Sequence, residues 1–322
     1  MRRWLKVGVS AGLLGLLFLV LPWQTVEDAL GRLPPLVWAG VLTGFLLGHM
    51  LGVVKWRLFV NAGRARLHGA DAALCYAAGL FANLCLPSIV GGDLLRMGLA
   101  TKFTGRTEAA IWGGVLDRAT DVLALAILVT GGGLLSREQL PGWTGRVVSV
   151  VLLLALGAAL LAVPVALRRP LARWPRRLRR PLGRSLVAVR RLARSPGTAA
   201  RGLGLSLMIQ ASFVLLNAWL GRAVGIDVPL TVWFLVWPLA KIASLLPISL
   251  GGLAVREASL AGLLLPFGVP AARSVVCSLL WQTVLIVGGL SGGAVWLVLS
   301  RVRHLPLALG QRPTAAAPAK NG

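Results

Sequence analysis

The 322-residue chain has few of the residues from which metal sites and disulfide frameworks are built. It contains three cysteines and three histidines. Cys75, Cys85 and Cys277 lie in apolar runs without the spacing of metal ligands, so we interpret them as small buried hydrophobic side chains. The histidines are scattered along the chain and form no ligand cluster. We therefore expect no disulfide framework, no metal site and no cofactor.

The motifs of common soluble enzymes are also missing from the sequence. There is no glycine loop between a strand and a helix for a nucleotide, no nucleophile elbow and no polar stretch long enough for a soluble domain. No acid–base pair stands beside a nucleophile either. We expect that the protein is not an enzyme, and that any transport by it draws on a gradient rather than on ATP.

Acidic residues are scarce, with 10 Asp and Glu against 34 Lys and Arg and a net charge of +24. In a soluble protein this charge would suggest nucleic acid as a partner. Here 57% of the residues are hydrophobic, and the basic residues lie in short segments between apolar runs, as the positive-inside rule expects. No RNA or DNA motif is present, so we exclude nucleic acid and predict a polytopic membrane protein.

Six segments approach or reach the roughly 20 apolar residues that a helix needs to cross a hydrocarbon core about 30 Å thick. The basic links place both termini in the cytoplasm, and the strongest marker is residues 168–201, with twelve arginines and no acidic residue. We expect this loop to contact anionic lipid, and the tail over residues 305–322 to be disordered. The segments are Val7–Leu21, Leu36–Val54, Ala109–Leu134, Val147–Leu167, Gly202–Val224 and Ser274–Leu299.

One motif occurs twice, at Leu86–Arg96 and at Leu246–Arg256. Both copies read L-P-x-x-x-G-G-x-x-x-R, and their offset of 160 residues is almost half of the chain. Each lies in apolar sequence, where a proline, a glycine pair and an arginine are unfavourable. The recurrence indicates two copies of one structural unit.

The apolar stretches around the two copies, residues 72–100 and 230–266, are predicted to be broken hairpins. If the first stretch crossed the membrane, Lys102 and Arg106 would lie outside, so the charge rule favours a re-entrant hairpin. Three crossings then accompany each hairpin, and the second copy is upside down relative to the first. The predicted fold is an all-α polytopic membrane protein of about six transmembrane helices plus two re-entrant hairpins, built as an inverted repeat.

This fold divides the chain at its basic loop. Residues 1–167 hold the first repeat and, from residue 147, the start of the second. Residues 168–201 form the cytoplasmic loop, and residues 202–304 complete the second repeat.

The motif itself predicts an anion site. A half-helix that begins after a glycine pair offers free backbone N–H groups and the positive end of its dipole, which bind phosphate. Arg96 and Arg256 lie within about one turn of these ends and add guanidinium donors. Alternatively, the glycines allow close packing and the arginines pair with Asp93 or Glu257. The glycines are Gly91, Gly92, Gly251 and Gly252.

A second charged cluster lies inside the predicted span Ala109–Leu134. Asp117 and Asp121 are spaced i and i+4 and share one helix face, and Arg118 is placed to pair with Asp121. Charges at this depth are costly in lipid, so they should face the protein interior or a wet cavity. They could serve packing, or relay a proton or substrate. Lys241, also in an apolar run, could contribute to the same cavity.

Three segments carry a resemblance to a known family: LPSIVGGDLLR, DRATD and LPISLGGLAVREAS. Together they resemble the membrane region of lysylphosphatidylglycerol synthase/flippase proteins and their free-standing flippase-like relatives, over roughly Leu5–Arg303. The resemblance implies movement of a lipid from the inner to the outer leaflet, in the type case an aminoacylated phosphatidylglycerol. The soluble aminoacyl-transfer region of the bifunctional members has no counterpart here, so it implies a translocase part without the synthase. Free-standing relatives are associated with hopanoid, cardiolipin and polyprenyl-linked substrates.

The leading hypothesis is therefore a flippase-like translocase of a phosphate-bearing lipid in a bacterial inner membrane. Its headgroup would be held by the half-helix ends, Arg96 and Arg256, while Asp93, Asp117 and Asp121 would contact a cationic part of it or exchange a proton. The alternatives are a secondary transporter of a small anionic solute and a non-transporting scaffold. A lipid-synthesising enzyme could be the partner of a translocase or of a scaffold.

Overall fold

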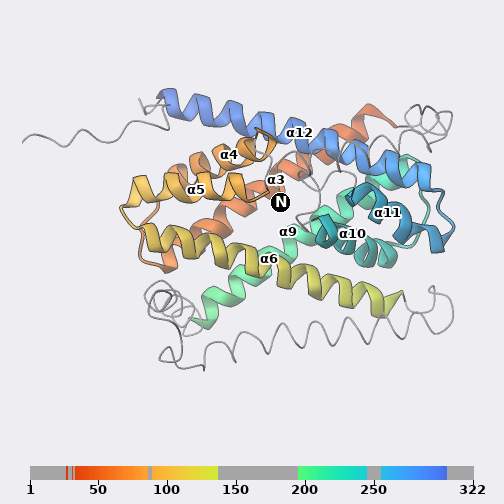
Figure 1. Cartoon of the computed structure of the whole chain (residues 1–322), viewed down its shortest axis with the longest axis horizontal. Helices are drawn as coiled ribbons and strands as arrows, with labels where there is room; N and C mark the ends of the chain where they lie inside the picture. Colours follow the sequence, from red (N-terminus) through yellow and green to blue (C-terminus); the bar gives the residue numbers. More distant parts are fainter. Residues whose placement is uncertain are drawn as a thin grey trace, which may run out of the picture.

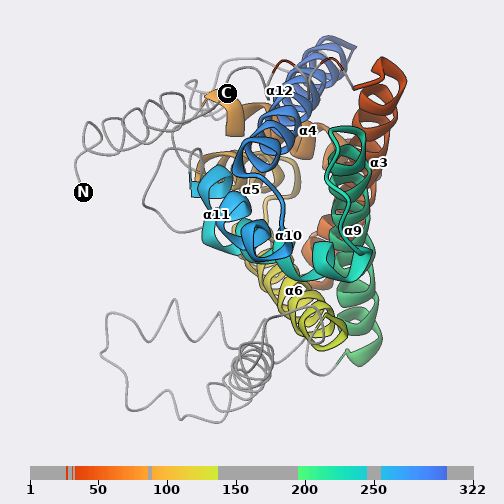
Figure 2. The same cartoon turned by 90° about the vertical axis from the view of Figure 1, so that its right-hand side faces the viewer.

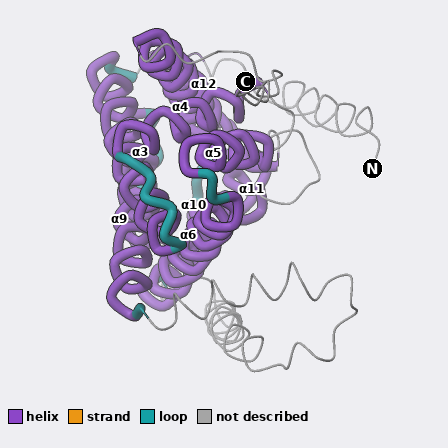
Figure 3. Tube along the Cα trace, turned by 90° about the vertical axis from the view of Figure 1, so that its left-hand side faces the viewer, coloured by secondary structure: helices purple, strands orange, loops and turns teal. Residues whose placement is uncertain are grey.

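Every regular element in the described part of the chain is a helix (Figures 1 and 3). The computed structural model describes residues 33–85, 89–136, 195–244 and 255–302, together with Glu27 and Gly31. This confirms the all-helical class. The elements are α3 (Pro35–Ala62), α4 (Gly69–Cys85), α5 (Ile89–Thr104), α6 (Thr107–Leu135), α9 (Pro196–Ala223), α10 (Leu230–Ser244), α11 (Val255–Leu264), the short 3₁₀ helix η3 (Leu265–Phe267) and α12 (Ala271–Val302).

Four helices, α3, α6, α9 and α12, are long and apolar enough to cross a membrane. They have 28, 29, 28 and 32 residues, which at 1.5 Å per residue gives about 42–48 Å. They coincide with four of the six predicted spans, although α9 begins at Pro196 rather than at Gly202. The other two predicted spans, most of the arginine-rich loop and the tail lie outside the described residues.

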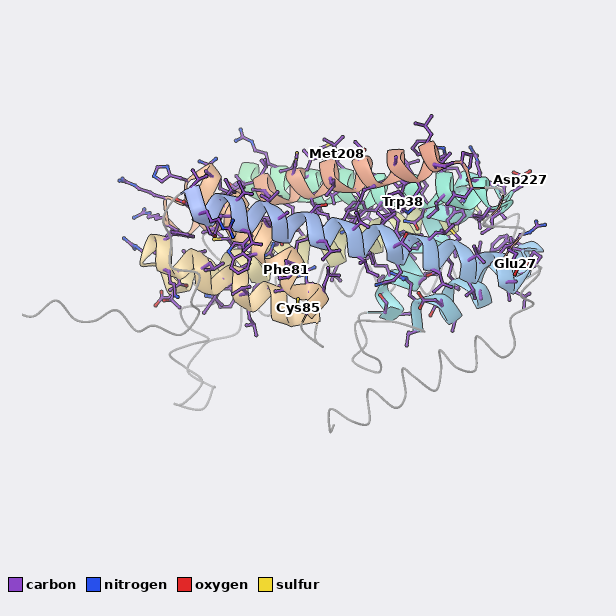
Figure 4. All side chains as sticks on the ribbon, turned by 90° about the horizontal axis from the view of Figure 1, so that it is seen from above. Glu27, Trp38, Phe81, Cys85, Met208 and Asp227 are labelled. Carbon is purple, nitrogen blue, oxygen red and sulfur yellow. The ribbon has the colours of Figure 1, made fainter. Side chains whose placement is uncertain are left out.

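The four long helices run between the same two ends of the molecule, two in each direction. The end at which α3 and α12 finish is the end at which α6 and α9 begin (Figure 1). Glu27 and Asp227 lie at the opposite end (Figure 4). Arg222, in the last turn of α9, and Arg273, in the first turn of α12, also lie at this opposite end and offset its two acidic residues. The first end is the more basic of the two, which is the sense that the positive-inside rule predicted. The basic residues at or just beyond the first end are Arg64, Arg66, Lys102, Arg106, Arg201 and Arg301.

The short helices form two pairs at opposite ends of the long ones, α4–α5 at one end and α10–α11 at the other (Figure 1). They have 17, 16, 15 and 10 residues, or about 15–26 Å each, which is shorter than a hydrocarbon core. The helix α4 packs along α12, and α10 packs along α6 (Figure 2). Each short pair therefore packs on the last long helix of the other half.

The break in the first pair lies earlier than the motif suggested. Because α4 ends at Cys85 and α5 begins at Ile89, Gly91 and Gly92 lie within the first turn of α5. The prediction that the new helix starts after this glycine pair is wrong. In the second copy, Gly251 and Gly252 lie outside the described residues, and α11 begins after them at Val255.

Gly92 is explained by close packing of α4 against α5. A Cβ at this position would meet the carbonyl oxygen of Gly79 and the side-chain oxygen of Asn83, both on α4. A Cβ at Gly79 would in turn lie 2.9 Å from the carbonyl oxygen of Gly92. The two backbones thus approach each other as small residues allow.

The helix α3 uses glycines in the same way against α9. Gly40, Gly44 and Gly48, four residues apart, face Trp219, Leu216 and Phe213 respectively. Near the middle of this interface, the rings of Phe45 and Phe213 stack with centroids 5.6 Å apart. The ring of Trp281 on α12 lies 5.6 Å from Phe45. This aromatic group is part of the larger hydrophobic core and lies beside the polar site.

Candidate functional site

A cavity of about 140 Å³ lies between the two halves of the molecule. Its wall is built by α3, α4, α5 and α6 from the first half and by α9 and α10 from the second. The long helices around it carry largely apolar sequence, so this is a polar chamber inside a membrane-length bundle. Its polar lining residues are His49, Lys55, Tyr76, Asn83, Asp93, Arg96, Arg118, Asp121, Gln210 and Lys241.

Lys55 of α3 is a site residue that the sequence analysis missed. Its side chain is 3% exposed, and its Nζ lies 3.0 Å from Asp117 Oδ1 and 2.6 Å from Asp121 Oδ1. It also donates to Ser206 Oγ of α9 at 3.0 Å. The predicted span ended at Val54, one residue before Lys55, whereas α3 continues to Ala62. The signal was the apolar run of residues 58–60, which continues the span past the lysine.

Arg96 of α5 faces the same carboxylate from the other side. Its Nη2 lies 2.8 Å from Asp117 Oδ2 and 3.1 Å from Asp93 Oδ1. Its guanidinium carbon lies 4.9 Å from the ring centroid of Trp56 and 5.1 Å from that of Tyr76. The faces of aromatic rings favour arginine over lysine, because the planar guanidinium can stack on them. Asp117 therefore bridges a cation on α3 and a cation on α5.

Arg118 pairs with α5 rather than within its own helix. Its Nε and Nη2 donate to the two carboxylate oxygens of Asp93, at 2.6 and 2.8 Å, which is a two-pronged arrangement. The predicted pairing of Arg118 with Asp121 is wrong, because Arg118 lies on the side of α6 that faces α5. The shared face of Asp117 and Asp121 is confirmed, since both contact the amine of Lys55.

Lys241 reaches the cavity from the second half. Its Nζ donates to Gln210 Oε1 at 2.7 Å and lies 5.1 Å from the ring centroid of Phe213. Both partners are uncharged. Among the described carboxylates, none lies within ion-pair distance of this ammonium. Lys241 is therefore a cation of the cavity wall whose direct contacts are uncharged, while the charges of Lys55, Arg118 and Asp121 lie elsewhere in the same wall.

Arg256 and Glu257 form a separate network on α11 and α12. The Nη2 of Arg256 lies 2.8 Å from Glu257 Oε1, which is the pairing that the alternative interpretation of the motif predicted. Arg256 also donates to Ser278 Oγ at 3.0 Å and to Gln282 Oε1 at 3.0 Å. Glu257 is fully buried. Neither residue lines the cavity, so Arg96 and Arg256 do not meet in one chamber.

The first glycine pair does not line the cavity either. The N–H of Gly92 donates to Asn83 Oδ1 at 3.1 Å, so this amide of the α5 N-terminus already has a partner. In the first copy, therefore, side chains rather than the amides of the glycine pair form the polar lining of the cavity. Among the residues that the structure describes, no group of three or more His, Cys, Asp and Glu could hold a metal ion.

Comparison with known proteins gives matches along most of the chain. Residues 3–292 match the family model described as the lysylphosphatidylglycerol synthase TM region. A protein of Methanothermobacter thermautotrophicus, described as a UPF0104 membrane protein, is 24% identical over 253 residues, which cover 69% of this chain and 71% of that protein. No solved structure matches.

Proposed function

The chain belongs to the family of the lysylphosphatidylglycerol synthase transmembrane region, and on that premise we propose that it is a lipid translocase. It moves a phospholipid or another phosphate-bearing lipid between the leaflets of a bacterial inner membrane. The headgroup enters the cavity, and the acyl chains stay in the bilayer. The termini lie in the cytoplasm, on the side of the basic helix ends.

The observation that carries the proposal is the cation-lined cavity among membrane-length helices. Ionisable residues at this depth are expensive and usually functional. The lining takes side chains from both halves of the molecule, with Arg96 on α5 and Lys241 on α10. A chamber shared between halves can open to one side or the other when the halves move relative to each other.

The proposed mechanism rests on an inverted repeat with two re-entrant hairpins. Three features support it: the motif recurs at half the chain length, the short helix pairs lie at opposite ends, and each pair packs on the last long helix of the other half. Rocking of one half against the other would expose the cavity alternately to each leaflet. The paired carboxylates hold the cations in place while the headgroup passes.

Reconstitution of the protein into vesicles with fluorescent phosphatidylglycerol tests the proposal. Wild-type protein should speed the appearance of label in the outer leaflet, as measured by dithionite quenching. The variant Arg96→Ala, compared at equal amounts of folded protein, should lose most of this activity. Wild-type vesicles with the rate of protein-free vesicles would contradict lipid translocation.

A second candidate function is secondary transport of a small anionic solute, favoured by the cavity volume of about 140 Å³. The same vesicles distinguish the two functions. A solute carrier should transport glycerol phosphate or inorganic phosphate at a rate that saturates with their concentration. A translocase should be inhibited far better by short-chain lipids that carry the same headgroup. A scaffold should show neither activity.

A further inference from the structure

The carboxylates around the cavity already have cationic partners. Three carboxylates and three cations form one connected network on the first-half side of the cavity, so their formal charges cancel. An ammonium group on a ligand would have to break an existing ion pair to reach any of these carboxylates. The pairs are Asp93 with Arg96 and Arg118, Asp117 with Lys55 and Arg96, and Asp121 with Lys55.

Lys241 adds one positive charge that this network does not offset. Its ammonium donates to Gln210 and lies over the ring of Phe213, both uncharged. A lysine ammonium carries three donors, so it can bind an anion without giving up Gln210. A charge held at membrane depth is costly until an opposite charge joins it. The cavity as a whole therefore has an excess charge of +1.

The size and the remaining polar groups restrict the ligand further. A cavity of about 140 Å³ is close to the engineered cavity of about 150 Å³ that accommodates benzene. It can hold a phosphate group and a few further atoms, and no acyl chain. Asn83, Gln210 and Tyr76 of the lining can donate to or accept from hydroxyl groups.

We propose that the cavity selects a compact phosphodiester headgroup with one net negative charge and hydroxyl substituents, and that it rejects headgroups bearing amines. The selection resides in Lys241, opposite the internally neutral network. This inference rests on the proposed function, since it names the lipid class that the translocase takes. A phosphatidylglycerol-like headgroup has this chemistry.

An aminoacylated headgroup fails for two reasons. A lysyl ester turns the net charge of phosphatidylglycerol from negative to positive, so the ligand would meet Lys241 with like charge. Its amines would also find each carboxylate taken by Lys55, Arg96 or Arg118. Like charges in a poorly solvated site discriminate strongly between ligands.

Binding of short-chain lipids to the purified full chain in detergent tests the inference. Dioctanoyl phosphatidylglycerol is compared with dioctanoyl phosphatidylethanolamine and dioctanoyl lysylphosphatidylglycerol by titration calorimetry. We expect phosphatidylglycerol to bind about tenfold or more tightly than the lysyl lipid. Inorganic phosphate and glycerol phosphate, which lack acyl chains, are titrated for comparison. Both should bind much more weakly than dioctanoyl phosphatidylglycerol.

Two variants test the role of the excess charge. Lys241→Gln removes it, and Gln210→Glu places a carboxylate beside the ammonium, so both should lose most of the preference for phosphatidylglycerol. Gln282→Glu is the matched control, because it makes the same change beside Arg256 and outside the cavity. Its preference should equal that of wild type. Lys241→Arg keeps the charge and should therefore keep the preference for phosphatidylglycerol. If Lys241→Gln fails to fold, the comparison of Lys241→Arg with Gln210→Glu still tests the role of the charge.

The outcomes separate the inference from the proposed function. If wild type binds the lysyl lipid as tightly as phosphatidylglycerol, or binds none of them, or Gln210→Glu keeps the preference, the inference is overturned. A protein that flips lysylphosphatidylglycerol as fast as phosphatidylglycerol remains a translocase while the inference fails. A protein that binds phosphatidylglycerol selectively and flips no lipid supports the inference while the proposed function fails.

Discussion

Arg96 and Arg256 occupy the same place in the two copies of the motif and have different surroundings. Arg96 lies on a cavity wall, between rings of two helices, and contacts carboxylates from α5 and α6. Arg256 is bound to the adjacent Glu257 and to uncharged groups of α12. Where the first half has Asp117, the second half has Cys277.

The difference shows how a duplicated motif can divide its tasks. In the first half, the carboxylate that holds the arginine also holds the lysine of α3, so the network ties three helices together around a chamber. In the second half, Arg256 and Glu257 pair with each other and hydrogen-bond to α12, away from the cavity. We interpret Arg96 as part of the wall of the binding site and the Arg256–Glu257 pair as a support for the second hairpin, which contributes Lys241 of α10 to that wall. Three substitutions test this division.

The largest effect is expected from Asp117→Asn. It removes the charge that Lys55 and Arg96 share, and leaves two buried cations undercompensated. Loss of one partner of a buried ion pair costs about 3–5 kcal/mol. Thermal unfolding of the purified protein in detergent should show a large drop in midpoint. Asp227→Asn, at an exposed loop, is the control, and an equal shift for both variants would show that the network contributes no stability.

A smaller loss of stability is expected from Glu257→Gln. Arg256 then keeps Ser278 and Gln282 as acceptors, so the free energy of unfolding should fall by about 3 kcal/mol. Lipid movement per folded molecule should stay at the wild-type rate, because this network does not line the cavity. Unfolding and dithionite quenching on the same preparation measure both. A folded variant without transport would place the second network in the site and break the comparison.

The smallest effect is expected from Gly92→Ala. The new methyl group would meet the carbonyl oxygen of Gly79, so α4 and α5 must separate slightly, at about 1–3 kcal/mol. Gly98→Ala in the same helix has open space around it and should be neutral or stabilise by up to about 1 kcal/mol. Unfolding midpoints that do not differ between the two variants would refute the packing explanation for Gly92.

Much of the fold followed from hydropathy and charge. Four spans agree with helices of the structure, because a long apolar run with a basic link at one end has few alternatives. The spacing of Asp117 and Asp121 correctly placed both on one face, since helix geometry alone decides that. The start of α5 was misplaced because a glycine pair can serve close packing as well as a helix start.

The candidate site was harder to predict, because its pairs join distant segments. Lys55 directly follows the predicted span Leu36–Val54, and its carboxylate partners lie more than sixty residues away on another helix. Arg118 had an acceptable partner at i+3, yet the carboxylate on α5 offers both of its oxygens. Residue spacing along one helix cannot choose between such partners. Lys241 was identified from the sequence, and only the structure shows that its direct contacts, Gln210 and Phe213, are uncharged.

Because α4 packs along α12, the first hairpin is synthesised well before the helix that covers it. At about 5–20 residues per second, a ribosome needs roughly ten to thirty seconds to proceed from Thr104 to Ala271. During this interval the first hairpin is synthesised and its last covering helix is not. The two ion pairs that join α5 to α6, Arg96 with Asp117 and Arg118 with Asp93, are available early. They can clamp the nascent hairpin until the final span leaves the insertion machinery.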